Sequence, residues 1–288
     1  MARRCSKIGV AFRRICGKPA SVRTQYPSDV PERNRVTPMG DIVAIPLRGA
    51  WTGNRGILHA GHEIVRFHAS DLWITCALEF RGRWREQWLP HRWTYLYFHD
   101  EAVSFAAGHR PCAECRRESY RAYQAAWAGG LGTGLPSAAR MNRQLHAERI
   151  VRGSHRRRLH AASWADLPDG AFVLLGTPGT PGATGVPAIV AGDELITWTY
   201  DGYGTRRRRP RYGAARLITP PATVAALRDG YPVQIDPAAR RLRRGARNRP
   251  SDPGPKVRVS GRCYRREPQR PYGEPSVTGP ATPDRRSG

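Results

Sequence analysis

The chain contains a Cys-x-x-Cys pair, Cys112 and Cys115, within the segment DEAVSFAAGHRPCAECRR. Two thiolates at this spacing can bind one metal ion from a tight turn, and zinc is the ion that such sites prefer. A redox pair is a second interpretation, but the strand-then-helix context of thioredoxin-like proteins is missing. Two unlinked thiols are the third interpretation. We favour a Zn²⁺ site that includes both cysteines.

A structural zinc site needs four ligands, so two more must come from elsewhere in the chain. Cys76 lies in the apolar, strand-like run LWITCALEF and offers a third thiolate. A histidine would complete a Cys3His site, and we select His59 for this role. The rival histidines are His62, His91, His99 and His109.

Helices on both sides of the pair are predicted to position it. Asp100 is a suitable N-cap for a short helix that Gly108 would end. A second helix is predicted over 118–128, where three aromatic residues recur at helical spacing. A third is predicted over 138–151, with Ser137 as its N-cap. The pair would then lie in a tight turn between two helices.

The segment Tyr97 to Arg116, with its sequence EAVSFAAGHRPCAEC, resembles the metal-binding domain of the bacterial Ada DNA-alkylation repair protein. In that family the Cys-x-x-Cys supplies two of four zinc ligands, and an upstream Cys-x3-Cys or His-x3-Cys pair supplies the others. The resemblance implies zinc binding at Cys112 and Cys115 and, less directly, at Cys76. The residues four positions before and after Cys76 are leucine and phenylalanine, so the methyl-accepting pair is absent and methyl transfer is not implied.

The core as a whole is similar to a set of uncharacterised actinobacterial proteins through RGAWTGNRGILH, HRPCAECRR and LHAER, which implies no activity. We expect an α+β fold in four parts. Residues 1–35 are predicted to be a disordered basic arm, and 36–160 an Ada-like zinc-binding domain with a small antiparallel sheet. Residues 161–235 form a β-rich, half-barrel region with one short helix, and 236–288 a disordered Arg/Pro-rich tail.

Alternation and turn residues predict individual strands in both regions. In the first region they are 41–47, 63–67, 72–80, 84–89 and 93–98; in the second they are 171–175, 186–190, 195–200 and 215–218. The intervening segment GYGTRRRRPRYG is interpreted as a basic loop.

The formal net charge of +25 favours a polyanionic partner, DNA or RNA. Residues 1–35 carry nine basic and two acidic side chains, and residues 237–288 carry fourteen and four. Arginines interleaved with aromatic residues suit base stacking beside phosphate contacts, although a sheet with one buried face gives the same alternation. The candidate contacts are Arg81, Arg83, Trp84 and Arg85 in one group, and Arg206, Arg207, Arg208 and Arg209 in another.

His146 and Glu148 are the candidate catalytic residues, although a spacing of two places them on different helix faces. No apolar run is long enough to cross a membrane, and no signal peptide is evident, which predicts a cytoplasmic protein. We expect a zinc-binding, nucleic-acid-associated protein. A metal-dependent hydrolase or nuclease and a structural zinc protein without a nucleic-acid role are the alternatives, so catalysis stays open.

Overall fold

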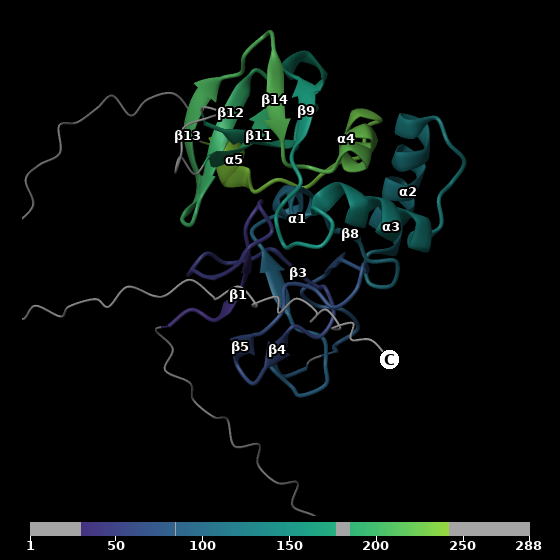
Figure 1. Cartoon of the computed structure of the whole chain (residues 1–288), viewed down its shortest axis with the longest axis vertical. Coiled ribbons are helices and arrows are strands. Elements are labelled where there is room, and N and C mark those ends of the chain that lie inside the picture. Colours follow the sequence, from purple (N-terminus) through teal and green to yellow (C-terminus); the bar gives the residue numbers. More distant parts are fainter. Residues whose placement is uncertain (1–29, 84, 177–184, 242–288) are drawn as a thin grey trace, which may run out of the picture. The chain divides into compact units, whose positions relative to one another are not determined.

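The computed structural model describes residues 30–83, 85–176 and 185–241 and has an α+β fold (Figure 1). Most of the predicted arm, most of the predicted tail and the residue Trp84 lie outside the described residues. The described part contains two six-stranded sheets, one two-stranded sheet and five α-helices.

The first sheet has the strand order β2-β1-β7-β3-β6-β8. Its β1–β7 and β6–β8 pairs are parallel, and the other three are antiparallel. Beside it, β4 and β5 form a separate antiparallel pair. The strands are β1 (Arg33–Val36), β2 (Ile42–Ala44), β3 (Trp51–Asn54), β4 (His59–Ala60), β5 (Glu63–Ile64), β6 (Ile74–Cys76), β7 (Leu96–Phe98) and β8 (Arg110–Pro111).

The second sheet is antiparallel throughout, with the order β13-β12-β11-β10-β14-β9. Its strands are β9 (His160–Ser163), β10 (Phe172–Leu175), β11 (Val186–Ala191), β12 (Glu194–Thr199), β13 (Gly202–Arg208) and β14 (Ala214–Leu217). The helices are α1 (Glu101–Ala106), α2 (Arg117–Leu131), α3 (Ala138–Arg149), α4 (Pro221–Arg228) and α5 (Pro237–Arg241), with a 3-10 turn η1 (Trp164–Asp166).

The predicted helix starts are confirmed. The Asp100 carboxylate accepts a hydrogen bond from Val103 N at 2.8 Å, which satisfies one of the free N–H groups at the start of α1. The Ser137 hydroxyl accepts from Arg140 N at 3.2 Å and caps α3 in the same way. Gly108 follows α1 with φ +89°, a conformation that glycine adopts without steric cost.

Three local predictions are corrected. Strand β1 begins at Arg33, inside the segment predicted to be disordered. The described part of 84–89 contains turns and no strand, and Trp88 there has φ 61°. The predicted basic loop contains the edge strand β13, where Arg206 pairs with Glu194 across the sheet at 2.5 Å. Charged side chains suit an edge strand, because they discourage further strand addition.

The helices and the second sheet share one hydrophobic core. Phe105 of α1 and Trp127 of α2 belong to the same buried cluster as Val173, Leu195 and Leu217 of the second sheet. Helices α2, α3 and α4 lie together, as Figure 1 shows. A smaller buried cluster, which includes Val36, Leu96 and Phe98, belongs to the first sheet.

Two consecutive buried carboxylates also connect distant parts of the chain. Glu101 accepts hydrogen bonds from Arg116 Nη2 at 2.5 Å, Tyr231 Oη at 2.8 Å and Gln234 N at 3.0 Å. Asp100 accepts from Tyr203 Oη at 2.7 Å and Asp236 N at 3.0 Å. Because each carboxylate is surrounded by donors, burial leaves its oxygens satisfied.

Candidate metal centre and histidine pocket

The sulfur atoms of Cys76, Cys112 and Cys115 all lie within 4.8 Å of one another. Strand register explains the convergence. Strand β6 runs parallel to β8, with Ile74 opposite Arg110 and Thr75 opposite Pro111, so the next residues on each side are Cys76 and Cys112. Cys112 N donates to Thr75 O at 2.9 Å and fixes this register.

This group fits a tetrahedral metal ion. Zinc–sulfur bonds of ~2.3 Å at tetrahedral angles place the sulfurs about 3.8 Å apart. Cys112 is buried, and the other two cysteines are half-buried. Glu114 N donates to Cys112 Sγ at 3.4 Å, as expected of a turn that holds a thiolate. The three cysteines can therefore hold a metal ion, and soft thiolate ligands favour zinc.

Hydrogen bonds among the three cysteines shift the pKa of each thiol. Hydrogen bonds from the Cys115 and Cys76 thiols lower the pKa of Cys112 to about 2. Donating to Cys112 raises the pKa of Cys76, and burial adds to the rise. The hydrogen bond to Cys112 raises the pKa of Cys115 as well.

The structure places His59 elsewhere, and no histidine of the described residues belongs to the sulfur group. The His59 ring is held by Thr94 Oγ1, 2.7 Å from Nδ1, and by Leu89 O, 3.2 Å from Nε2. Its edge also contacts Trp88, with ring centroids 5.4 Å apart. Both ring nitrogens are thus already engaged within the protein.

The rival histidines also lie outside the group. His109 is fully buried and packs against Trp73 and Phe98. His99 lies between Asp236 and Trp198 Nε1, at 3.3 Å from each. Among the described residues, no fourth side chain of a metal-binding type joins the three sulfur atoms.

The first group of predicted nucleic-acid contacts is largely occupied by the protein itself. Arg85 stacks on Trp93 at 4.0 Å and donates to its carbonyl oxygen at 2.8 Å. Arg83 pairs with Glu114 at 2.7 Å in an exposed ion pair, and exposed Arg81 lies over the ring of Phe80. Trp84 lies outside the described residues.

The second group of predicted nucleic-acid contacts contains two arginines that are bound within the protein and two that are exposed. Arg206 pairs with Glu194 at 2.5 Å, and Arg209 donates to Leu167 O at 2.9 Å. Arg207 and Arg208 are exposed on β13. These two side chains present the free positive charge of the group.

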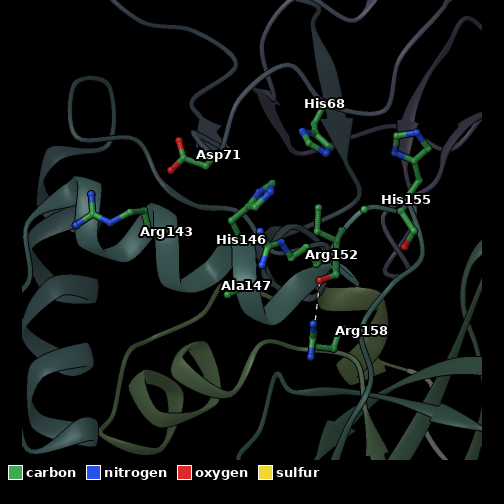
Figure 2. A pocket seen from close by; sticks show the side chains of 11 residues that line it. His68, Asp71, Arg143, His146, Ala147, Arg152, His155 and Arg158 are labelled. Carbon is green, nitrogen blue, oxygen red and sulfur yellow. Dashed lines mark hydrogen bonds between the residues drawn. The ribbon is translucent and has the colours of Figure 1, made fainter. Parts of the chain in front are cut away.

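The two candidate catalytic residues point to different places. The Glu148 carboxylate accepts from Gln144 Nε2 at 3.0 Å and from Ala222 N at 3.0 Å, where it satisfies an N–H at the start of α4. His146 lines a pocket of about 610 Å³ on the other side of α3 (Figure 2). Glu148, a residue of α3, therefore has a structural role at the start of α4.

The pocket draws on three segments: the loop before β6, the helix α3 and the connection from α3 to β9. In Figure 2 the rings of His68 and His146 lie near each other in an edge-to-face arrangement, with Asp71 and Arg143 toward one end and His155 toward the other. The ring centroid of His68 is 5.1 Å from that of His146 and 6.2 Å from that of His155. Sequence reasoning missed His68 and His155 as members of one site, because both lie in loops without a periodic pattern.

No family model, curated protein or solved structure matches this chain. The resemblance to the Ada metal-binding domain therefore stays a proposal. No helix of the described residues is long and apolar enough to cross a membrane.

Proposed function

We propose that the chain binds one Zn²⁺ through Cys76, Cys112 and Cys115 and that the ion has a structural role. The observation that carries this proposal is the convergence of three sulfur atoms within 4.8 Å. The ion would join the end of β6 to the turn between β8 and α2, in the manner of the Ada metal-binding domain. A bound ion contributes its binding free energy to folding, since the unfolded chain has no preformed site.

Metal analysis of Cys76→Ser and Cys112→Ser beside the wild type tests this part. We expect one zinc per wild-type chain and loss of that zinc in both variants. Cys263→Ser is the matched control, because it removes one thiol that is not among the three proposed ligands, and it should keep full occupancy. X-ray absorption should show three sulfur neighbours and one nitrogen or oxygen neighbour. A site with only two sulfur neighbours by X-ray absorption, or less than one zinc per wild-type chain by metal analysis, would contradict the proposal.

We further propose that the protein associates with nucleic acid. The net charge of +25 and the exposed guanidinium groups of Arg207 and Arg208 support this role. The hydrolase alternative is less supported, because the Glu148 carboxylate caps α4 and is poorly placed to act as a general base.

Fluorescence anisotropy with labelled single-stranded DNA and RNA, measured over a range of salt concentrations, tests the nucleic-acid role. We expect affinity to fall steeply with salt. A chain of residues 30–241 should retain part of the affinity. Complete loss of binding in this shortened chain would contradict a nucleic-acid role for residues 30–241 and would favour a structural zinc protein whose excess charge lies in its terminal segments.

A further inference from the structure

The histidine pocket carries more positive charge than its own carboxylates balance. Three arginines line it: Arg143, Arg152 and Arg158. Asp71 is the one carboxylate among its lining residues. Its volume of about 610 Å³ lies within the range of about 300–1,000 Å³ typical of small-molecule sites. A ligand of nucleotide size would therefore fit.

Two further guanidinium groups lie buried behind the pocket. Arg149 and Arg55 both stack on the ring of Trp73, at 3.8 Å and 4.0 Å from its centroid. Arg149 Nη2 donates to Asp71 O at 2.8 Å and contacts His146 Nδ1 at 3.0 Å, so it reaches two lining residues. Neither arginine has an ion pair with a carboxylate of the described chain.

Each of these buried arginines also has a nitrogen without a hydrogen-bond partner among the described residues, Arg149 Nε and Arg55 Nη2. Burial, together with the nearby positive groups, lowers the pKa of Arg55 to about 9 and that of Arg149 well below its ordinary value. The carboxylates of Asp41, for Arg55, and of Asp71, for Arg149, oppose this fall, but neither forms an ion pair with the arginine. Burying cations without a directly paired carboxylate is costly, and an anion in the pocket would offset that cost.

The contact with Arg149 fixes the state of His146. A guanidinium group can only donate, so Nδ1 of His146 must accept and its proton must lie on Nε2. His68 makes no hydrogen bond within the described part of the chain. Burial and the neighbouring His146 and Arg149 lower its pKa to about 4, so its ring is neutral near neutral pH. Both rings are thus available to hydrogen-bond a ligand.

A metal ion is a poor match for this pocket. The three histidines do not form a group with converging ligand atoms among the described residues. The guanidinium groups beside and behind them would repel a cation. Charge therefore selects an anion, and arginine is the side chain best suited to phosphate.

We propose that this pocket binds the phosphate group of a nucleotide unit, whether free or part of a nucleic acid. Arg143, Arg152 and Arg158 supply the charge, and His146 Nε2–H donates a hydrogen bond. The rings of His68 and His155 offer surfaces on which a base can stack. Only the source of the phosphate rests on the proposed nucleic-acid role; the site itself does not.

Calorimetric titration of the zinc-loaded full chain tests the proposal, with inorganic phosphate, a nucleoside monophosphate and a short single-stranded DNA as separate probes. The pocket variant is Arg143→Gln with Arg152→Gln, and the matched control is Arg48→Gln with Arg121→Gln, two arginines that do not line the pocket. All four arginines are exposed, so both variants should fold. The pocket variant should weaken binding of the monophosphate by at least about tenfold, and the control should leave it nearly unchanged.

Equal losses in the two variants, or no measurable binding of any phosphate probe at physiological salt, would overturn the proposal. Binding of the monophosphate without the DNA would support the pocket and contradict the nucleic-acid role. A third variant, Arg207→Gln with Arg208→Gln, separates the two roles: DNA binding that is lost in it and unchanged in the pocket variant would support the nucleic-acid role and contradict the pocket. Imidazole nitrogen NMR adds an independent check: a proton on Nδ1 of His146 would refute the geometry used above.

Discussion

The buried pair of Glu101 and Arg116 gives a sharp prediction, because the same substitution can be made in an exposed pair. The side chains of Glu101 and Arg116 are 1% and 3% exposed. The Glu101 Oε1 atom accepts from both Arg116 and Tyr231, and Oε2 accepts from Gln234 N. In Glu101→Gln, either orientation of the amide places an NH2 group against a donor.

The expected cost follows from these contacts. An unsatisfied buried donor costs about 1–3 kcal/mol, and removing one partner of a buried ion pair costs about 3–5 kcal/mol in total. Within the described part of the chain, Arg116 Nη1 already lacks a hydrogen-bond partner, so no spare acceptor is available to compensate. Glu101→Gln should therefore lower the free energy of unfolding by about 3–5 kcal/mol. Glu114→Gln, which breaks the exposed pair with Arg83, should cost about 0–1 kcal/mol.

Urea unfolding of the zinc-saturated proteins, followed by tryptophan fluorescence, measures both free energies. A companion variant, Arg116→Met, tests the coupling: the double variant should be less destabilised than the sum of the two single changes. If Glu101→Gln loses no more stability than Glu114→Gln, the carboxylate is not the buried partner of Arg116 and the reasoning fails.

Four other outcomes are expected. A zinc chelator should lower the melting temperature of the wild type, and a preparation that keeps its melting temperature after verified zinc loss would contradict a structural metal. Glu148→Ala removes the acceptor of the Ala222 N–H group and should lower the free energy of unfolding, measured by thermal denaturation, by about 1–2 kcal/mol. A glutamate-to-alanine change at an exposed position should change this free energy little. A Cβ at position 53 would lie 2.1 Å from Ile74 O, so Gly53→Ala should yield little folded protein in a solubility assay. The pKa of His68 is about 6.5 in the unfolded chain and about 4 in the folded chain. As the pH falls between these values, the unfolded chain binds a proton that the folded chain does not, so the free energy of unfolding decreases. His68→Gln should therefore lose less stability than the wild type on acidification, as read from melting temperatures, and an unchanged slope would argue against the shift.

The sequence predicted the thiol group because its signals are local. The spacing of Cys112 and Cys115 defines a turn, and Cys76 lies in an apolar run that forms a neighbouring strand. The helix starts at Asp100 and Ser137 were predictable for the same reason, since a cap depends on residues within one turn. The identity of a fourth ligand depends on tertiary packing, and the ring of His59 is instead held by Thr94.

The histidine pocket could not be predicted from the sequence, because only the folded chain brings its residues together. Three strands of the first sheet and three helices lie between His68 and His155 in the sequence, and neither histidine lies in a motif. The helix spacing did separate His146 from Glu148, and the structure places the former in the pocket and the latter at α4. The run of arginines in β13 was mistaken for a loop, because charge is a poor guide to strands at a sheet edge, where solvent takes the side chains.

The hydrogen bonds to Asp100 and Glu101 bear on how this protein can be shortened. Their donors include Tyr203, Tyr231 and the backbone of Gln234 and Asp236, far along the chain. A protease cut or stop codon before residue 231 would remove hydrogen-bond donors from the two buried carboxyl groups. Fragments intended to isolate the cysteine-bearing half should therefore aggregate or fail to express unless both acids are neutralised by substitution.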